Sequence, residues 1–533
     1  MLGHDTHSAF PGDPGVQQHT HAIGAAIWAK DDLGAHMVPP QPGPPTAEWL
    51  NSAPHYALHV AADSSGRHRR RRDGHPVWFT VGAFALTILG VAWYVFPHQL
   101  LLMVLLGAGV FNMTVGTLEA RWRLHAWRTP EAAESGGWPT AVSPRDAQMT
   151  FSLIVAAKDE AEVIADTLRG LIRQNHPHYE ILVSLCADDT ATVAAAMSVA
   201  RQYPDLIRVV TDHYDDPSKA RQLNTALPFC VGTVVGVIDA EDDVASALLL
   251  HVEALLVDSG AHIVQGGVQL MNLGEGPRKW FQVHNVLEYF FWYTSRMSYQ
   301  ADVGFVPLGG NTVFIYRRLL EEIDGWPLSL TEDCALGVRL AADFNVTVAT
   351  AYSAELCTRE EAPPTIFNKE LGSLFWQRDR WIRGFIYELI QGTWRRMPGR
   401  RQRIFAVYIL STPLLQGLSC LLLPLAIISA LTTKAPIGLA LFLFSPLIPM
   451  GITILTQLIG LRQFGREFGQ RVTVWHYASV LFLTPLYQLI LMAATTTAAY
   501  KCATGDTKWY KTGRASEHRA KRPVAVIRQG ATR

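Results

Sequence analysis

An acidic run stands where a buried strand is expected to end. Residues 233–238 are apolar except for their first threonine, and Asp239-Ala240-Glu241-Asp242-Asp243 follows them directly. Four carboxylates so close together repel one another, so the run is costly unless a cation is bound. Mg²⁺ and Mn²⁺ prefer oxygen ligands and often bridge one or two carboxylates to the phosphates of a substrate. The alternative is a strand-to-helix loop whose acids stabilise the start of the next helix.

Two smaller polar groups could act on the same substrate. Asp188-Asp189 follows an apolar stretch at 181–186, and Lys219 and Arg221 open a predicted helix. The two cations could meet the charge of a diphosphate. Aspartate is also common in plain loops, and the two cations could equally belong to a solvated helix face.

A third acidic pair opens an otherwise apolar helix. Glu332 and Asp333 follow Thr331, which is a natural N-cap, and acids suit a first helical turn. An aspartate held there can also act as a general base for an attacking hydroxyl. Upstream, Gly309-Gly310-Asn311 permits close approach of the backbone to a ligand, although a plain turn would explain these residues too.

The last group is Gln377-Arg378-Asp379-Arg380-Trp381, in a segment rich in large aromatic residues. Aromatic and basic residues mixed in this way suit a helix that lies in the membrane interface. Trp381 could serve as a stacking platform and Arg380 could stabilise a leaving phosphate. A helix that only anchors the protein is the alternative.

These residues need elements that bring them together, and residues 151–238 provide an alternation of strands and helices. Strands are predicted at 151–157, 181–186, 207–211 and 233–238, and helices at 161–174, 191–202 and 218–227. Asp159 is the expected N-cap of the first helix. The alternation predicts an α/β domain with a parallel sheet covered on both faces. Ligands bind outside the carboxyl ends of such strands, where Asp188-Asp189 and the acidic run lie.

The overall charge excludes some classes of function. The chain has 533 residues, with 46 Lys and Arg against 46 Asp and Glu, and 17% of its residues are charged. The neutral balance argues against nucleic acid as a partner. Six scattered cysteines without a CxxC pair or zinc spacing argue against a disulfide scaffold. A soluble domain usually carries about a quarter charged residues, so the shortage of charge needs another explanation.

Uncharged stretches explain that shortage, since each is about the ~20 residues that a membrane-crossing helix needs, or longer. They are residues 77–96, 99–118, 404–431, 435–460 and 472–500. The basic run at 67–72 places the N-terminus in the cytoplasm by the positive-inside rule. Three crossings after residue 403 would put the basic C-terminal tail outside, so we expect one stretch to form a hairpin or to lie in the interface.

The resulting organisation has five parts. Residues 1–75 form a disordered tail rich in His, Pro and Gly, and residues 76–118 form two transmembrane helices. A cytoplasmic domain follows at 119–403, then a block of three to four membrane segments at 404–500. Residues 501–533 form a basic tail.

The order and spacing of four of these motifs resemble one family. Asp188-Asp189, Asp239-Ala240-Glu241, Thr331-Glu332-Asp333 and Gln377-x-x-Arg380-Trp381, between two membrane blocks, are similar to the membrane-integrated glycosyltransferases of family 2. That family includes cellulose, chitin and hyaluronan synthases. The resemblance covers residues 151–384 and the flanking membrane stretches. It implies a Rossmann-like GT-A glycosyltransferase domain inserted between N- and C-terminal transmembrane helices.

The resemblance also implies roles for single residues. Asp188 and Asp189 would contact the base and ribose of the nucleotide, with Lys219 and Asn224 beside the donor. Asp239 and Glu241 would hold the diphosphate through Mg²⁺ or Mn²⁺, and Asp333, with Glu332 beside it, would be the general base. The acceptor and the leaving diphosphate would be positioned by Gln377, Arg380, Trp381, Gly309, Gly310 and Asn311. Glu241 stands where relatives have a second Asp, which makes Asp242 a competing ligand.

The expected protein is therefore an inverting β-glycosyltransferase of the inner or plasma membrane, with several crossings and a cytoplasmic catalytic domain. The donor would be a nucleotide-diphosphate sugar, with a UDP-sugar as first choice. The acceptor would be a growing polysaccharide that is exported across the bilayer, with export partners undefined, or alternatively a lipid that receives a single sugar. A membrane transport protein or a non-catalytic scaffold is the rival class. Uncharged membrane stretches argue against transport, and the retained acids Asp239 and Asp333 argue against a scaffold.

Overall fold

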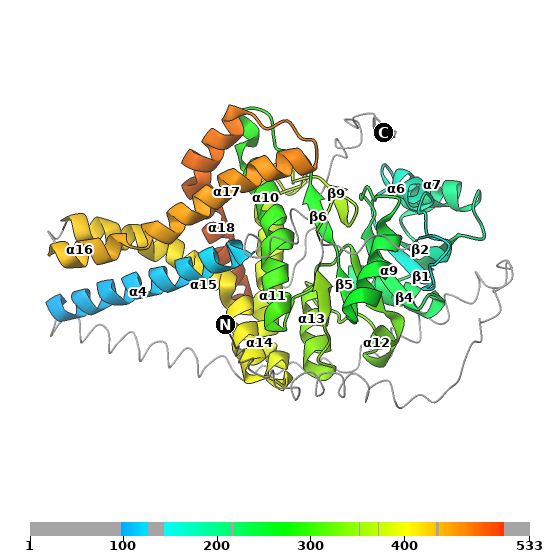
Figure 1. The fold of residues 1–533 in the computed structure, drawn as a ribbon, viewed down its shortest axis with the longest axis horizontal. Coiled ribbons are helices and arrows are strands. Elements are labelled where there is room, and N and C mark those ends of the chain that lie inside the picture. Colours follow the sequence, from blue (N-terminus) through cyan, green and yellow to red (C-terminus); the bar gives the residue numbers. More distant parts are fainter. Residues whose placement is uncertain are drawn as a thin grey trace, which may run out of the picture. The chain divides into compact units, whose positions relative to one another are not determined.

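The computed structural model describes residues 97–125, 143–214, 218–350, 352–370, 372–432 and 436–505. The expected N-terminal tail, the apolar stretch 77–96 and most of the basic C-terminal tail lie outside these residues. Figure 1 shows the arrangement of the described helices and strands.

The first half of the domain alternates strands and helices, as predicted. The elements are β1 (Phe151–Ala157), α6 (Ile164–Leu171), β2 (Tyr179–Cys186), α7 (Thr190–Ala200), β3 (Ile207–Asp212), α8 (Lys219–Ala226) and β4 (Val234–Asp239). The four strands are parallel, in the order β3-β2-β1-β4. The predicted α/β class is confirmed.

The second half of the sheet departs from the parallel arrangement. Strand β7 (Val313–Tyr316) pairs antiparallel with β4 and with β5 (Ile263–Gln265), and β8 (Val348–Thr350) extends the sheet beside β5. A second sheet pairs β6 (Gly267–Leu270) with β9 (Cys357–Glu360). The purely parallel sheet expected from the first four strands is therefore wrong for the rest. These later strands have three or four residues, which is too short for a recognisable hydrophobic period.

The sheet is covered on both faces. On one face α6, α7 and α9 (Leu248–Ser259) enclose an apolar cluster around Leu153 and Val183. On the other face α8, α12 (Arg317–Glu322) and α13 (Glu332–Asp343) pack over Ile154 and Leu182. All four of these strand side chains are fully buried. Removing so much apolar surface from water fixes the strands and therefore the positions of their carboxyl ends.

One expected helix cap is wrong. Asp159 does not cap the first helix, because α6 begins only at Ile164, with Val163 at the N-cap position. Asp159 instead has a positive φ of 54°, and its backbone N–H donates to Asp189 Oδ2 at 2.6 Å. The chain thus makes an extra turn before the helix, because Asp189 supplies an acceptor that the local sequence does not show.

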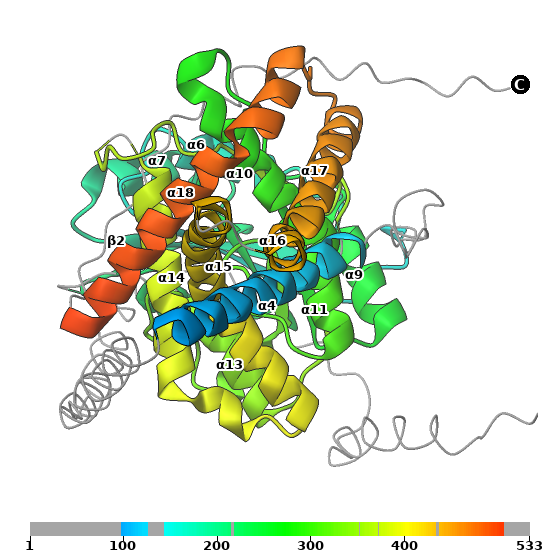
Figure 2. The same ribbon diagram turned by 90° about the vertical axis from the view of Figure 1, so that its left-hand side faces the viewer.

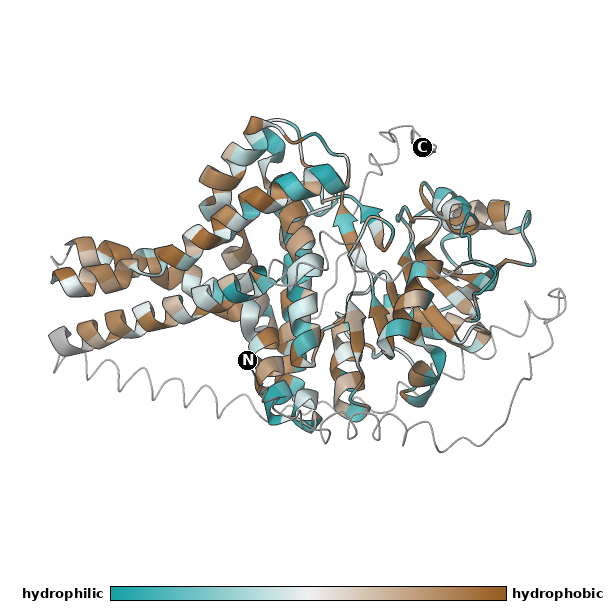
Figure 3. Ribbon diagram, viewed as in Figure 1, coloured by the Kyte–Doolittle hydropathy of each residue, from teal (hydrophilic) through white to brown (hydrophobic). Residues whose placement is uncertain are grey.

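A layer of helices lies between the sheet domain and the apolar helices (Figure 1). It comprises α10 (Trp280–Phe291), the π-helical turn η4 (Trp292–Arg296), α11 (Met297–Val303) and α14 (Leu374–Gln391). Long apolar helices lie next to this layer: α4 (Pro97–Arg123), α15 (Arg400–Thr432), α16 (Ile437–Phe444), α17 (Leu447–Glu467) and α18 (Val474–Thr504). In Figure 3 the long helices are predominantly hydrophobic, whereas the sheet domain is mixed.

Four helical segments of the described chain are long and apolar enough to cross a membrane. They are Leu101–Arg123, Arg400–Thr432, Ile437–Glu467 and Val474–Thr504. The last one differs in direction from α15 and α16. Figure 2 shows α15 and α16 nearly end-on, whereas α18 runs across the view.

Helix α18 is joined to α14 and α10 by polar contacts. Lys501 Nζ lies 2.8 Å from Asp379 Oδ2 of α14, and Arg383 lies 3.3 Å from the same carboxylate. The side chains of Asp379 and Arg383 are each only 1% exposed. Tyr487 of α18 donates a hydrogen bond to Glu288 of α10. Because buried charges are costly without partners, these pairs fix α14 and α10 against α18.

Candidate functional site

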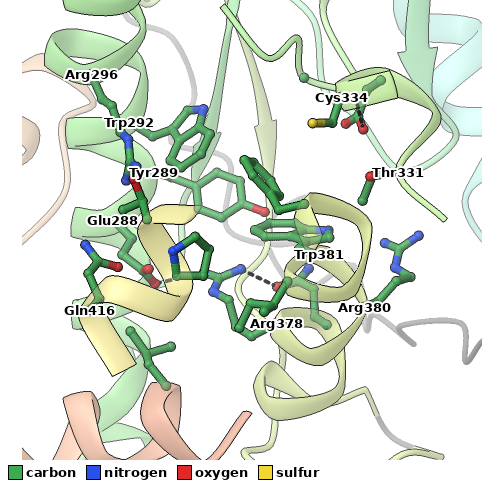
Figure 4. Close-up of a pocket in the computed structure, with 18 of the residues that line it drawn as sticks. Glu288, Tyr289, Trp292, Arg296, Thr331, Cys334, Arg378, Arg380, Trp381 and Gln416 are labelled. Atoms are coloured by element: carbon green, nitrogen blue, oxygen red, sulfur yellow. Dashed lines mark hydrogen bonds and ion pairs between the residues drawn. The ribbon is translucent and has the colours of Figure 1, made fainter. Parts of the chain in front are cut away.

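A cavity of about 290 Å³ connects the sheet domain with the apolar helices. Lys219 and Asp239 line it at the sheet, Glu332 and Asp333 line it at the start of α13, and α10 and α14 form its walls. Figure 4 shows Trp381, Tyr289 and Trp292 beside this space, with Arg380 and Thr331 across from Arg296.

Lys219 lies at the centre of the acidic end. Its Nζ forms an ion pair with Asp239 and donates to the Gly310 carbonyl at 2.6 Å. Burial alone would lower the pKa of this ammonium, but Asp239, Glu332 and Asp333 raise its pKa well above the ordinary value. Lys219 therefore stays charged and holds the carboxylate that ends β4 close to the two carboxylates that open α13.

Both acids of α13 have pKa values above their ordinary values. Burial raises the pKa of Glu332 to about 7, with a further contribution from Asp333, while Lys219 and Arg380 oppose the shift. Burial also raises the pKa of Asp333, which accepts a hydrogen bond from the Cys334 N–H at 2.7 Å. Raised carboxylate pKa values inside a cavity are typical of general acid–base groups. Thr331 occupies the expected N-cap position, but its side chain makes no capping hydrogen bond.

Gly310 faces the two acids at close range. A Cβ on this glycine would lie 3.1 Å from Asp333 Oδ2 and 3.3 Å from Glu332 Oε1. The backbone of the glycine loop can approach the acids so closely only because there is no side chain. The expected contact of this loop with a ligand is compatible with that geometry.

Three carboxylates meet in a group suited to a divalent cation. Ligand atoms of Asp239, Glu241 and Glu360 all lie within 4.8 Å of one another. Asn311 organises the group, since its Nδ2 donates to Glu360 at 2.9 Å and its Oδ1 accepts from the Asp239 N–H at 3.3 Å. Hard oxygen ligands in this number fit Mg²⁺ or Mn²⁺. The residues present therefore fit the expected metal.

Asp242, the competing ligand, lies behind this group. It is 1% exposed, and its Oδ2 accepts a hydrogen bond from the Asp239 N–H at 3.1 Å. Burial and the neighbouring carboxylates, Glu360 first among them, raise its pKa well above the ordinary value. Glu360 itself was not anticipated from the sequence. It ends β9 in the second, small sheet, and its only sequence signal is an acidic pair after a short polar segment.

Three of the residues expected beside the donor, Asp188, Asp189 and Asn224, lie outside the lining of this cavity. Asp188 is exposed at the end of β2, and Asp189 caps α7 by accepting from the Thr192 N–H at 3.2 Å. Asn224 makes two hydrogen bonds to the backbone of Trp326, at 2.9 and 2.7 Å. These three side chains therefore do not line the cavity together with Lys219 and Asp239.

A buried acid lies close to Asp188. Asp212 ends β3 and is 1% exposed. Burial raises the pKa of Asp212 to about 6, and the charge of Asp188 adds to the increase. The carboxyl ends of β2 and β3 therefore form a second acidic area beside the metal group.

Helix α14 places its motif along the cavity wall. Gln377 is buried and accepts from Arg378 Nη1 at 3.1 Å, and Arg380 is close enough to Glu332 and Asp333 to oppose the rise of their pKa values. The Trp381 ring lies 6.1 Å from that of Tyr289. These residues come together with the acids because one turn of α14 faces the start of α13.

Arg378 has a positioning role that the sequence did not reveal. Its guanidinium lies 4.4 Å from the centre of the Trp381 ring and donates to Glu288 at 2.8 Å and to Asn285 at 2.7 Å. Charged hydrogen bonds of this kind are strong when they are buried. Arg378 therefore fixes the orientation of Trp381 relative to α10.

Close packing between α14 and Thr331 predicts a structural effect of one substitution. A Cβ on Gly384 would lie 2.1 Å from Thr331 Oγ1, so Gly384→Ala should lower the free energy of unfolding by roughly 1–3 kcal/mol through overpacking. Thermal melting of the detergent-purified protein measures the change. Gly438→Ala is the control, because nothing lies within 4 Å of that position. Equal melting temperatures for the two variants would contradict this prediction, and adding Thr331→Ala should partly restore stability.

The sequence is similar to a known family of glycosyltransferases and to two named synthases. Residues 147–384 match the profile of a family described as "Glycosyltransferase like family 2". The chain is 26% identical over 377 residues to a beta-monoglucosyldiacylglycerol synthase of Trichormus variabilis, covering 68% of this chain and 75% of that protein. A synthase of the same name from a Nostoc species is 27% identical over 382 residues, with the same coverage.

A solved structure supports the fold. The mannosyltransferase PcManGT from Pyrobaculum calidifontis, in complex with GDP-Man and Mn²⁺, aligns with 76% of this chain and 100% of its own at a TM-score of 0.51 and 17% identity. The likeness concerns the arrangement of the sheet and its helices. The family match identifies residues 147–384 as a glycosyltransferase domain of family 2, which makes the chain an enzyme of that class, and the structural likeness shows that the fold is GT-A.

Proposed function

We propose that this protein transfers a single sugar from a UDP-sugar, with glucose as first choice, to a diacylglycerol-type lipid in the membrane. The observation that carries the proposal is the extent of the cavity. It runs from Lys219 and Asp333 to Gln416 of α15 and to Leu491 and Met492 of α18. A lipid whose acyl chains remain among apolar helices could present its hydroxyl group to the acids along this path. The names of the two relatives point to the same class of product.

Polysaccharide synthesis with export is the second candidate. It is favoured by Gln377, Arg380 and Trp381, which line the cavity at the expected acceptor end. The lipid acceptor is preferred because the relatives that align over three quarters of their own length carry the name of a lipid synthase.

In the proposed reaction Asp333 accepts the proton of the acceptor hydroxyl. The oxygen then attacks the anomeric carbon from the side opposite to the diphosphate, and the bond from that carbon to the diphosphate oxygen breaks. Inversion of the configuration follows. The leaving diphosphate would be stabilised by Lys219 and Arg380, and a divalent cation held by Asp239, Glu241 and Glu360 would supply further positive charge.

The orientation in the membrane is part of the proposal. Arg121 and Arg123 end α4, and Arg400, Arg401 and Arg403 open α15, next to the catalytic domain. By the positive-inside rule these residues support a cytoplasmic location for that domain, where nucleotide sugars are made. We assign α18 to the membrane interface, because it runs across the direction of α15 and α16 (Figure 2). The basic C-terminal tail then stays on the cytoplasmic side.

The size of the product tests the function. Purified protein in lipid nanodiscs, supplied with diacylglycerol, Mn²⁺ and a panel of labelled UDP-sugars, should yield a lipid that carries one hexose. Thin-layer chromatography and mass spectrometry identify the product. A labelled polymer, or transfer only when no diacylglycerol is present, would overturn the proposal.

The raised pKa of Glu332 predicts a pH dependence. Because the pair formed by Glu332 and Asp333 gains a proton as the pH falls through about 7, kcat/KM should fall by up to about tenfold per pH unit below that value. Glu332→Gln removes the like charge and should move the profile to lower pH. Glu388→Gln is the matched control, since burial raises the pKa of Glu388 to about 7 as well, but Glu388 does not line the cavity. A rate that does not change between about pH 5 and about pH 8 would contradict the assignment.

A further inference from the structure

Two arginines meet at the membrane-facing wall of the cavity. Arg123 is the last residue of α4, and Arg296 is the last residue of the π-helical turn η4. Their guanidinium carbons lie 4.6 and 5.4 Å from the centre of the same Trp122 ring. All three side chains line the cavity, and Figure 4 shows Arg296 at its edge. Single π-helical turns within α-helices are frequent at functional sites.

The donors of this cluster lack acceptors. Arg123 Nε and Nη1, Arg296 Nε and Trp122 Nε1 are buried, and no described residue accepts a hydrogen bond from them. Arg296 as a whole is 9% exposed. Leaving a charged donor buried without an acceptor is expensive, and two neighbouring guanidinium groups repel each other. Such an arrangement is expected where an anion completes the site.

Nearby carboxylates do not balance the two cations. Glu119, one turn before Arg123, also lines the cavity, and its Oε1 has no partner among the described residues. Glu288 is already engaged by Arg378 at 2.8 Å and by the Tyr487 hydroxyl. The wall therefore keeps one positive charge in excess after Glu119 is counted.

The position and the donors indicate the class of ligand. Planar guanidinium groups match the oxygens of a phosphate, and an indole N–H adds one more donor. The end of a membrane-spanning helix lies at the depth of the lipid headgroups. We propose that Arg123, Arg296 and the Trp122 N–H bind the phosphate of an anionic phospholipid. The diacylglycerol proposed as acceptor has no phosphate, so the anionic phospholipid would be a second lipid at the wall of the same cavity, and its binding does not depend on the proposed acceptor.

Lipid retention tests the site without using the transfer reaction. The full-length protein would be purified in detergent with equal amounts of phosphatidylglycerol and phosphatidylcholine, and native mass spectrometry would count the bound lipids. The wild type should retain phosphatidylglycerol selectively. In Arg123→Gln/Arg296→Gln that retention should fall about tenfold or more, which corresponds to about 1.4 kcal/mol. Arg121→Gln, an exposed cation on the same helix, should behave as the wild type.

The same experiment tests whether the site binds a phosphate from another source. Inorganic phosphate or UDP is added to the complex with phosphatidylglycerol, and retention of the lipid supports the proposal. Displacement by either one would overturn the assignment to a lipid, and so would equal retention in the double variant and the wild type. The melting temperature of the lipid-free double variant reports on folding. It should not fall, because the substitutions remove unpaired buried charges, whereas a purely structural pair would lose stability.

Discussion

Replacing Asp333 by Asn is expected to lower the rate of sugar transfer by about 10²–10⁴-fold. The amide has the same shape and can still accept the hydrogen bond that the Cys334 N–H donates to Asp333 at 2.7 Å. It cannot take a proton from an acceptor hydroxyl. Binding of the donor should persist, because Lys219 and the metal group are unchanged. The turnover number with saturating UDP-sugar and diacylglycerol is the quantity to measure.

Glu332→Gln is the matched comparison for Asp333→Asn. Both acids lie beside Gly310 and both are within the influence of Lys219 and Arg380. The glutamine variant should retain most of the turnover and differ mainly in its pH profile. If Asp333→Asn kept the full rate while Glu332→Gln lost it, Glu332 would be the base. If both variants were fully active, the proposed mechanism would be wrong.

Removal of divalent cations should stop the reaction, and Glu360→Gln should raise the metal concentration that is needed. Glu360 brings a third carboxylate within 4.8 Å of Asp239 and Glu241. Residues that merely support metal ligands are commonly worth 10–100-fold in metal affinity, so a direct ligand should cost at least about tenfold. Titration of the EDTA-treated enzyme with Mn²⁺, followed by electron paramagnetic resonance and by activity, gives both values.

Asp243→Asn is the control for Glu360→Gln. Asp243 belongs to the same acidic run as Asp239, yet it is not part of the three-carboxylate group, and its backbone pairs with that of Arg359. The Mn²⁺ concentration that the Asp243→Asn variant needs should equal that of the wild type. Full activity in EDTA, or the same Mn²⁺ titration for Glu360→Gln and the wild type, would show that Glu360 does not hold the metal.

The sequence was informative where local pattern and strand geometry decide the outcome. Parallel strands end at one edge of a sheet, so Asp239 could be placed near a cluster of functional groups before the fold was known. The alternation of residues 151–238 also predicted four strands and their helices within a few residues. The antiparallel β7 could not be predicted, because its pairing depends on how the chain returns after α10 and α11.

The roles of residues that contact distant parts of the chain could not be predicted from the sequence pattern. Glu360 reaches Asp239 from a different sheet, and no local spacing connects the two. Arg378 stands in a recognisable motif, but its burial follows from the packing of α14 between α10 and α18. Asn224 shows the opposite case. A residue expected beside the donor binds the backbone of Trp326, since the loop before α13 passes over α8.

The polar contacts that join α18 to α14 and α10 limit how the enzyme can be truncated. The catalytic domain cannot be released as a soluble fragment by cutting the chain before α18. Such a truncated protein would leave Asp379, now 1% exposed, without Lys501, and Glu288 without the Tyr487 hydroxyl. It would also uncover the face of α14 that carries Phe375, Ile382 and Ile386. Helix α18 and the domain that carries the site are thus a single folding unit.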